Sequence, residues 1–272
     1  MATSGSPIDV TSNMESSPPA PLRPTAGSRR GTARSAVFAP LYQQIRHLLV
    51  ESLRQGEWMP GAAIPSETEL ANRFQVSQGT VRKAIDELAA ENLLVRRQGK
   101  GTFVATHNEP KAQHRFLRLV PDHGARGVAS SRFLECRTVR AVAEVTSRLG
   151  LRAGASLIHI RRVLLFGDAP TVLDDIWLPA GPFRRLSADM LAQYNGPLYG
   201  LFESEFGVRM IRAEEQLRAV AATPEAAASL QVAADSPLLR VDRVSYTYGD
   251  RAIEFRRGHC ATTDFHYWNA LT

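Results

Sequence analysis

The chain has 272 residues, of which 44% are hydrophobic and 22% are charged, so it is long enough for two globular domains with buried cores. This composition excludes a disordered or fibrous protein. A total of 33 lysines and arginines against 27 aspartates and glutamates gives a net charge of +6, which favours a polyanionic partner.

Only two cysteines are present, Cys136 and Cys260, and their spacing is not that of a metal site. We therefore expect reduced thiols, no zinc site and no cofactor. No stretch of the chain approaches the roughly 18 to 20 apolar residues of a membrane span, and the N-terminus has no apolar core of signal-peptide length. The expectation is a cytoplasmic protein that does not enter a membrane.

Composition divides the chain into a tail, a first domain, a linker and a second domain. We place them at residues 1–36, 37–104, 105–114 and 115–272. The tail is rich in Ser, Pro, Thr, Ala and Gly and has no sustained periodicity, so it is predicted to be disordered. Its arginines are either incidental charges in solvent or contacts to DNA phosphates, at positions Arg23, Arg29, Arg30 and Arg34.

The first domain is predicted to contain three helices. Apolar residues recur at helical spacing over about residues 40–55, which gives one amphipathic helix. A capping box of Ser66 and Glu69 opens a second, short helix. After a tight turn, a third helix with one apolar face covers about residues 77–92. This order of elements is typical of a helix-turn-helix.

The first turn of the third helix consists of small and polar residues, namely Ser77, Gln78, Gly79 and Thr80. A helix that enters the major groove end-on needs such residues, because they permit close approach and offer hydroxyl and amide groups to phosphates and base edges. One turn later Arg82 and Lys83 would add positive charge, and Arg82 can bind a guanine through two hydrogen bonds. Taken alone, the same residues are also compatible with simple helix capping and a solvated arginine.

A basic hairpin is predicted directly after this helix, in residues 93–105 (LLVRRQGKGTFVA). Its glycines permit the left-handed backbone conformations of a tight turn. Arg97 and Lys100 would meet backbone phosphates or the minor groove, and Gly99 would let the main chain approach DNA closely. A helix-turn-helix followed by such a wing indicates DNA binding more specifically than either part alone.

Four segments resemble, in order and spacing, the N-terminal domain of GntR-type bacterial transcription regulators: PLYQQI, PSETELA, VSQGTVRKAIDEL and GKGTFV. The resemblance covers about residues 38–104. It implies operator contacts by Thr68, Ser77, Gln78, Thr80, Arg82 and Gly99. Two residues depart from the family pattern, because Gln78 stands where Arg is frequent and Asn92 where Gly is common. Gln78 favours adenine over guanine, whereas Asn92 tolerates the left-handed conformation of a helix end.

The second domain is predicted to be an antiparallel sheet with helices packed on its face, which makes the chain an α+β protein. Two β-hairpins are indicated, one with strands at 156–166 and 170–179 and one over about residues 236–260. Residues 208–222 are ambiguous by period, but their alternation favours a strand. Helices are expected at residues 142–149, 188–193, 198–206 and 224–230.

Strand parity in the first hairpin indicates a candidate binding site. Arg162 lies in a row of apolar residues on one strand, and Asp174 interrupts a similar row on the partner strand. Burying a charge is costly unless it is paired. The two residues therefore either form a structural salt bridge or bind opposite ends of a polar small molecule. Tyr199 is either a residue that closes such a pocket or a core aromatic.

Residues 115–268 resemble the ligand-sensing UTRA domain of the HutC branch of GntR regulators, whose fold is that of chorismate lyase. The segments that carry the resemblance are WLP, PLYGLFE, RAEEQLRAVAA, SPLLRVDRV and IEFRRG. It implies that Arg162, Asp174 and Tyr199 line an effector pocket. Leu164 and Pro197 stand where relatives that bind sugar phosphates often carry Arg and Ser, which favours a carboxylate or another polar, less charged metabolite.

These observations predict a transcription regulator, most simply a repressor, that binds double-stranded operator DNA as a homodimer in the bacterial nucleoid and responds to a small molecule. Two recognition helices related by a two-fold axis would meet the major groove about one helical turn apart. A constitutive DNA-binding dimer without an effector is the first alternative. A lyase-like enzyme is the second, but no nucleophile elbow, histidine–carboxylate pair or metal-ligand cluster supports it, so we expect no catalysis.

Overall fold

The computed structural model describes residues 39–108, 117–124 and 127–270. The predicted tail at residues 1–36, with its four arginines, and most of the predicted linker at 105–114 lie outside the described residues. Within the described ranges, none of the helices has the length and apolar character that crossing a membrane requires.

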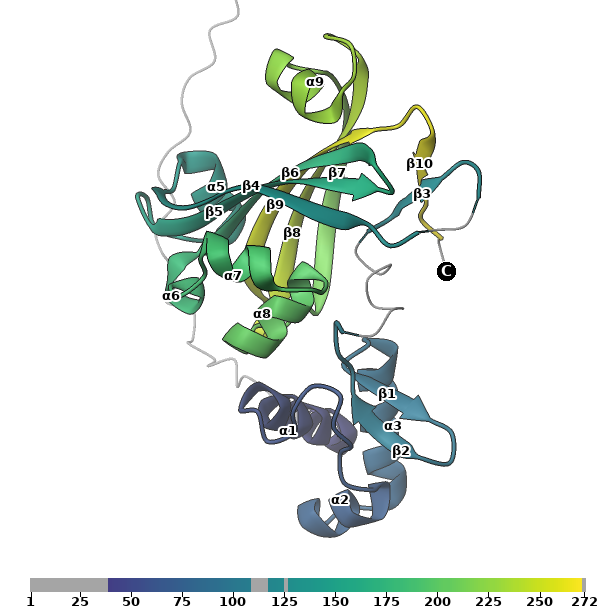
Figure 1. Cartoon of the computed structure of the whole chain (residues 1–272). Helices are drawn as coiled ribbons and strands as arrows, with labels where there is room; N and C mark the ends of the chain where they lie inside the picture. Colours follow the sequence, from purple (N-terminus) through teal and green to yellow (C-terminus); the bar gives the residue numbers. More distant parts are fainter. Residues whose placement is uncertain (1–38, 109–116, 125–126, 271–272) are drawn as a thin grey trace, which may run out of the picture. The chain divides into compact units, whose positions relative to one another are not determined.

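The region after residue 39 forms three helices and a two-stranded hairpin, as predicted (Figure 1). Its elements are α1 (Leu41–Arg54), α2 (Glu67–Phe74), α3 (Gln78–Ala90), β1 (Leu94–Arg97) and β2 (Gly101–Val104). Leu49, Leu70, Ile85 and Leu88 are fully buried where the three helices meet. Each such side chain contributes about 1.5 to 3 kcal/mol on burial, so the apolar faces hold the helices together.

The ends of these helices follow the predicted capping pattern. Ser66 and Glu69 form the complete capping box of α2, and the Ser77 side chain accepts a hydrogen bond from the backbone N–H of Thr80 at the start of α3. The sharp turn between α2 and α3 is made by Gln75, whose φ of 54° lies in the left-handed region. Asn92 has a φ of 56°, which confirms the conformation expected of it after α3.

The second folded region is an antiparallel sheet with short helices, in agreement with the predicted α+β class. Its elements are β3 (Leu119–Pro121), β4 (Ser130–Arg140), α5 (Ala143–Leu149), β5 (Ser156–Phe166), β6 (Ala169–Pro179), α6 (Ala180–Phe183), α7 (Ala188–Gln193), α8 (Leu198–Phe206), β7 (Arg212–Ala221), α9 (Pro224–Leu230), β8 (Pro237–Thr247), β9 (Arg251–Ala261) and β10 (Phe265–Tyr267), with a 3-10 turn at Tyr248–Asp250. The two predicted hairpins, the strand β7 and the helices α5, α7, α8 and α9 are confirmed. The strands β3, β4 and β10 and the helix α6 were not predicted.

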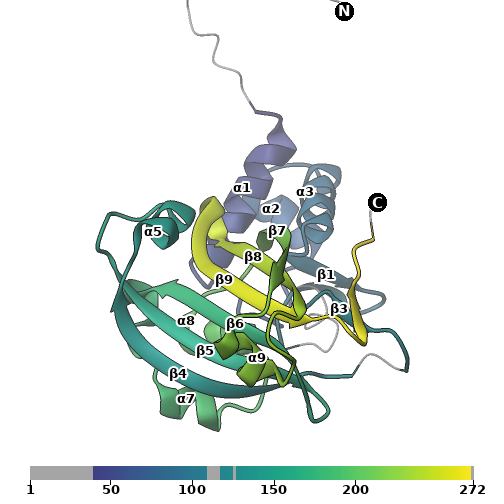
Figure 2. The same ribbon diagram turned by 90° about the horizontal axis from the view of Figure 1, so that it is seen from above.

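Six strands form one sheet in the order β4-β5-β6-β9-β8-β7, and β3 pairs separately with β10 (Figure 2). Helices cover both faces of the large sheet, whereas the sequence led us to expect them on one face. Even-numbered residues of β5, such as Ile158 and Ile160, pack under α6, α7 and α8. Odd-numbered residues, such as Leu157 and Val163, pack under α5 and α9. The strand is therefore apolar on both sides, and its sequence shows a nearly continuous apolar run.

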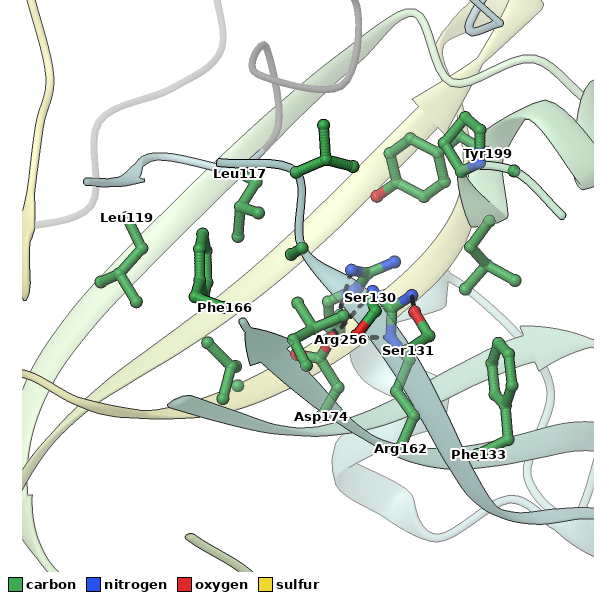
Figure 3. A pocket seen from close by; sticks show the side chains of 18 of the residues that line it. Leu117, Leu119, Ser130, Ser131, Phe133, Arg162, Phe166, Asp174, Tyr199 and Arg256 are labelled. Atoms are coloured by element: carbon green, nitrogen blue, oxygen red, sulfur yellow. Dashed lines mark hydrogen bonds and ion pairs between the residues drawn. The ribbon is translucent and has the colours of Figure 1, made fainter. Parts of the chain in front are cut away.

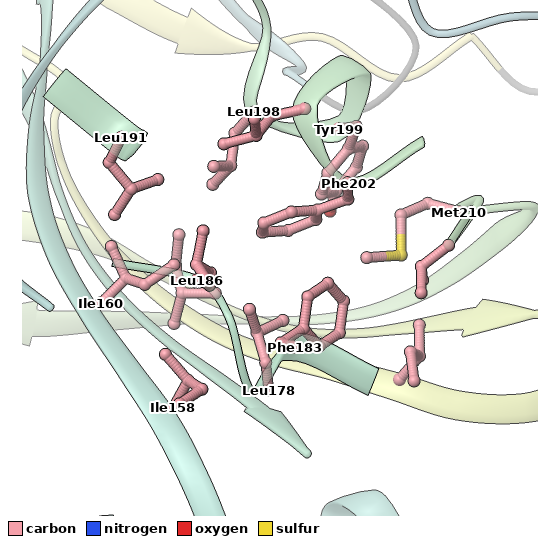
Figure 4. Close-up of a cluster of buried hydrophobic side chains, with 14 residues drawn as sticks. Ile158, Ile160, Leu178, Phe183, Leu186, Leu191, Leu198, Tyr199, Phe202 and Met210 are labelled. Atoms are coloured by element: carbon pink, nitrogen blue, oxygen red, sulfur yellow. The ribbon is translucent and has the colours of Figure 1, made fainter. Parts of the chain in front are cut away.

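The core under α8 determines where the first turn of that helix lies. Phe202 is fully buried and meets Phe183 edge to face with ring centroids 4.9 Å apart. Ile158, Ile160 and Leu178 pack against this pair from the sheet (Figure 4). Tyr199 lies one turn before Phe202 on the same buried side of α8, so the core holds its ring against the sheet.

Candidate functional site

The first turn of α3 exposes the residues that the sequence singled out. Gln78 and Gly79 are exposed, and the Ser77 hydroxyl lies 2.8 Å from the Thr80 hydroxyl while capping the helix. A Cβ atom added to Gly79 would meet only the Ser77 Oγ, at an ordinary 3.8 Å. The packing of the protein therefore does not require glycine at this position, and its small size leaves room for a molecule outside.

Glu67, which the sequence analysis did not select, links the candidate DNA-contacting side chains. Its Oε2 accepts hydrogen bonds from Arg82 Nε at 2.9 Å and from Gln78 Nε2 at 3.3 Å, and its Oε1 accepts one from Arg96 at 2.9 Å. Burial opposes ionisation of Glu67, but the hydrogen bonds from Arg82, Arg96 and Gln78 outweigh it, so its pKa is lowered. Glu67 therefore remains a carboxylate at neutral pH. It occupies the Nε side of the Arg82 guanidinium, while this side chain stays 56% exposed.

The other cationic candidates have separate supports. Lys83 Nζ lies 3.8 Å from the centroid of the Tyr42 ring, a cation–π distance, so this ammonium is directed toward α1. Thr68 is exposed in the first turn of α2. Among the described residues, Glu67 forms its side-chain hydrogen bonds with Gln78, Arg82 and Arg96 and not with Lys83 or Thr68.

The hairpin β1–β2 has the geometry predicted for a wing. Its turn contains Gly99 at a φ of 70°, and a backbone hydrogen bond from Lys100 N–H to the Arg97 carbonyl closes it. The Arg97 guanidinium lies 4.5 Å above the Phe103 ring, and the Lys100 side chain is exposed. Arg96 ties the hairpin to the helices through Glu67 and Asp86. The polar turn of α3, Arg82 and the wing thus belong to one connected surface, and their contacts with DNA stay predictions.

A cavity of about 630 Å³ opens on the sheet face that carries Arg162 and Asp174 (Figure 3). This volume lies within the range of small-molecule sites. Two adjacent rows of the sheet supply its polar residues. One row runs Arg162, Asp174, Gly258 and Val241 across β5, β6, β9 and β8, and the other places Arg243 opposite Arg256.

Arg162 and Asp174 pair directly across β5 and β6, and both also line the cavity. Arg162 Nε and Nη2 each lie 3.0 Å from Asp174 Oδ2, and Arg162 Nη1 donates to the Ser131 hydroxyl at 3.1 Å. The two side chains are only 6% and 3% exposed. Burial lowers the pKa of Arg162 although Asp174 acts in the opposite direction. The sequence left open whether the two residues form a salt bridge or line a pocket. In the structure they form a salt bridge with each other, and both also line the cavity.

Arg256 extends this cluster toward α8. It donates to Asp174 at 3.4 Å and to Glu254 at 3.0 Å, and Glu254 accepts a further hydrogen bond of 2.6 Å from the Tyr199 hydroxyl. Burial raises the pKa of Tyr199, so its hydroxyl stays protonated and can donate. The Nε atom of Arg256 is buried and has no hydrogen-bond partner among the described residues. A buried donor without a partner costs about 1 to 3 kcal/mol, which an acceptor on a ligand would recover.

The close approach of Asp174 to β9 depends on Gly258. A Cβ atom at residue 258 would lie 3.0 Å from Asp174 Oδ1 and 3.4 Å from a methyl group of Val172. Because such distances are tighter than ordinary contacts, a larger residue would displace the carboxylate. The glycine that ends the IEFRRG segment therefore has a structural reason that the sequence did not reveal.

Apolar walls flank the charged cluster on two sides (Figure 3). Leu119, Leu164 and Val172 are buried on one side next to Phe166, and Phe133 lies on the other. Leu164 lies in this wall, so the side chain that the cavity meets at this position is apolar. The cavity therefore combines hydrogen-bond donors at its centre with apolar surface around them.

Sequence reasoning missed Arg243, Arg256 and the serines of β4. Arg243 binds Glu215 through Nε at 2.6 Å, and Tyr267 donates to the same carboxylate. The parity rule that selected Arg162 would also have selected Arg256, because Glu254, Arg256 and Gly258 share one face of β9. Nothing local in the sequence indicated that β9 lies next to β6.

Comparisons with known proteins agree with this geometry. The family model described as "Bacterial regulatory proteins, gntR family" matches residues 41–104, and the UTRA domain model matches residues 125–266. The transcriptional repressor NagR of Bacillus subtilis is 30% identical over 79% of this chain and 88% of its own length. The histidine utilization repressor of Pseudomonas putida is 28% identical over 77% of this chain and 83% of its own length.

A solved structure also resembles the second region of the chain. The ligand-binding domain of a GntR-family transcriptional regulator from Bordetella bronchiseptica is 56% identical and superimposes with a TM-score of 0.57. The match covers 58% of this chain and 98% of that domain. The fold of the second region is therefore similar to that of an experimentally determined ligand-binding domain of related sequence.

Proposed function

Because this chain belongs to the GntR family of bacterial transcription regulators and carries a UTRA domain, we propose that it is a homodimeric repressor that releases its operator when a small carboxylate binds. The family binds operator DNA, and the UTRA domain binds small-molecule effectors. The identity of the effector, the dimer and the contacting residues belong to the proposal. A protein that acts on the chromosome would reside in the cytoplasm.

Operator recognition rests on the exposed polar turn of α3, which is the observation that carries the proposal. Gln78 and Arg82 lie side by side because both contact the same carboxylate oxygen of Glu67. We assign Gln78 to an adenine and Arg82 to a guanine or a phosphate, since these are the pairings that their hydrogen-bonding groups favour. Ser77, Thr80 and Thr68 would contact the sugar–phosphate backbone, with Arg97, Gly99 and Lys100 of the wing in or near the minor groove.

Effector recognition rests on the donors at the centre of the cavity. Arg162 and Arg256 both donate to Asp174, and they donate further to Ser131 and Glu254 respectively, but these bonds do not use all of their N–H groups. A ligand carboxylate matches these donors and would also satisfy Arg256 Nε. The surrounding leucine, valine and phenylalanine side chains would bury an apolar body. The expected effector is therefore a small organic acid with an apolar portion.

We assign no catalytic role to the cavity. Its only thiol among the described lining residues belongs to Cys260, whose pKa burial raises to about 12. A thiol with that pKa stays protonated at neutral pH and is a poor nucleophile. The carboxylates of Asp174 and Glu254 are engaged by arginines, a state that suits binding better than proton transfer.

One experiment tests the proposal as a whole. Operator sequences would be selected from a random DNA library with the full-length protein, and binding would be followed by fluorescence anisotropy in the presence of organic acids, amino acids and amino sugars. An organic acid should lower operator affinity by at least about five-fold, the lower end of measured couplings between sites. Selection of no sequence would reject the repressor, and unchanged affinity with every compound would leave the constitutive DNA-binding protein as the better account.

A further inference from the structure

The sheet of the second region ends in two edge strands, β4 and β7, and the two edges differ. The pairing of β4 with β5 is interrupted by a register shift between Phe133 and Glu135. The pairing of β7 with β8 runs without interruption from Arg212 to Ala221. Bulges protect an edge from pairing with another chain, whereas a long regular strand leaves a row of unpaired N–H and C=O groups available. The available edge is β7, the light green strand at one end of the sheet (Figure 1).

The middle of β7 is largely open to solvent, although Gln216 accepts a hydrogen bond of 2.9 Å from Arg148 of α5. This middle, residues 216–219, is exposed on both faces of the sheet, and Leu217 keeps 44% of its surface in solvent. The strand contains no proline that would prevent further pairing. An exposed leucine at the centre of a ten-residue edge strand is a feature that monomeric proteins usually avoid.

Arg218 provides the charge that selects a partner. In the register of β7 and β8 it stands directly opposite Arg240, and like charges in that position are unfavourable. Asp242 binds Arg240, but the structure gives Arg218 no hydrogen bond or ion pair with any described residue. On the same face of β7, Glu214 is 64% exposed. The strand thus offers an unneutralised cation and an exposed acid four residues apart.

From these features we propose that β7 pairs antiparallel with β7 of a second copy of this chain, about a two-fold axis at Gln216. Directly opposed residues in an antiparallel pair point to the same face, so a symmetric pairing relates residues of equal parity and its axis passes through one residue. With the axis at Gln216, Glu214 stands opposite Arg218 of the second copy, twice by symmetry. With the axis at Glu215, Arg212 would oppose Arg218. With the axis at Leu217, Arg218 would face only Gln216.

This inference rests on the proposed homodimer and identifies its contact surface. The two sheets would join into one continuous sheet of twelve strands, formed from two copies of the six-stranded sheet. Each Arg218 would gain the carboxylate that its own chain does not supply, and both copies of Leu217 would leave solvent. Glu214 would keep its present contacts with Arg212 and Tyr246, since a carboxylate accepts several hydrogen bonds.

A charge-swap experiment on the full-length protein tests the pairing. Glu214→Arg leaves two arginines on each strand, and Arg218→Glu leaves two glutamates, so each variant should form its own homodimer about ten-fold more weakly than the wild type. A mixture of the two variants restores both opposite-charge pairs. With different affinity tags, native mass spectrometry should show a heterodimer fraction well above one half, against one half for a mixture of tagged wild-type chains.

The matched control makes the same charge changes on the other edge strand. Glu135→Arg and Arg137→Glu on β4 reverse the charges of an acid and an arginine that are two residues apart and form an ion pair, and their mixture should stay at one half. Random mixing of the β7 variants, or enrichment with the β4 variants instead, would overturn the proposed interface while leaving the homodimeric repressor intact. A wild-type protein that sediments as a monomer at 100 µM, about the concentration scale of weak dimers, would reject both.

Discussion

The surface around α3 and the cavity of the second region contain the same chemical pair under opposite conditions. Arg82 pairs with Glu67 while its side chain is 56% exposed, and Arg162 pairs with Asp174 while its side chain is 6% exposed. In each case one carboxylate serves more than one arginine. In the first pair Glu67 is only 15% exposed, but the guanidinium of Arg82 is open to water and salt, so the pair contributes between about 0 and 1 kcal/mol. The buried pair lies where removing one partner costs several kcal/mol.

This difference determines what each pair can do for a ligand. Arg82 can exchange Glu67 for a phosphate or a base at little cost, because the arginine paired with Glu67 and the arginine surrounded by water differ little in free energy. Arg162 cannot leave Asp174 without leaving a charge buried alone. The exposed arginine is therefore exchangeable and the buried one is preorganised, which suits a regulator that must release DNA and hold a metabolite in one orientation.

The largest expected effect comes from breaking the buried pair. Asp174→Asn should lower the free energy of unfolding by about 3 to 5 kcal/mol, because Arg162 and Arg256 both lose their shared counter-ion inside the protein. Urea titration followed by tryptophan fluorescence measures this change. The matched control is Asp168→Asn in the exposed turn between β5 and β6, which should change stability by less than about 0.5 kcal/mol. Equal effects of the two substitutions would mean that the cavity charges are not desolvated.

Arg82→Ala should have the next largest effect, on DNA binding rather than on stability. Loss of the contact should weaken operator binding by about 1 to 3 kcal/mol and relax specificity at one base pair. The control is Arg54→Ala on α1, because that arginine is also 56% exposed and also paired with a glutamate. Anisotropy titrations at a fixed salt concentration compare the two variants. Unchanged operator affinity for Arg82→Ala would remove this residue from the interface.

Tyr199→Phe should lower the stability by a smaller amount, and its comparison with Tyr246→Phe again sets a buried hydrogen bond against an exposed one. The buried hydroxyl donates to the carboxylate of Glu254, so its removal should cost about 1.5 kcal/mol of stability. Tyr246→Phe removes a hydroxyl that donates to the exposed Glu214, and it should cost less than about 0.5 kcal/mol. Chemical denaturation of both variants measures the difference. A larger loss for Tyr246→Phe would contradict the role of burial assigned here.

The sequence predicted the elements that depend on local pattern. The bounds expected for α7, α8 and α9 are the observed ones. Parity selected Arg162 and Asp174 as charges in apolar rows, and the structure adds that they stand opposite each other. β4 was not predicted because an edge strand that is largely exposed on both faces has no apolar alternation to detect. Arg256 and Gly258 joined the site only through the pairing of β9 with β6, which connects distant parts of the chain. Glu67 was overlooked because an acid in the first turn of a helix already has a local explanation.

The smallest expected effect on stability comes from Glu67→Gln, and its pH dependence follows from the sign of the pKa shift. The pKa of Glu67 is lowered from its ordinary 4.5 in the folded protein, as the hydrogen bonds from its arginines outweigh burial. Its ionisation therefore stabilises the fold above that ordinary value, and the contribution is lost as the pH falls through the folded pKa. At pH 7 the variant should be less stable by under about 1 kcal/mol, and urea titrations at decreasing pH should show the difference vanish.

The same substitution decides whether the contrast between the two regions holds. If Glu67 only holds Arg82 until DNA replaces it, then Glu67→Gln removes a negative charge next to the phosphates and should strengthen binding to random DNA more than binding to the operator. The ratio of the two affinities would then fall, while operator affinity would not. If operator binding instead weakens as much as in Arg82→Ala, Glu67 orients the arginine in the complex. Arg82 would then be preorganised by Glu67, as Arg162 is by Asp174. The exposure of an arginine would then not determine whether it is exchangeable or preorganised.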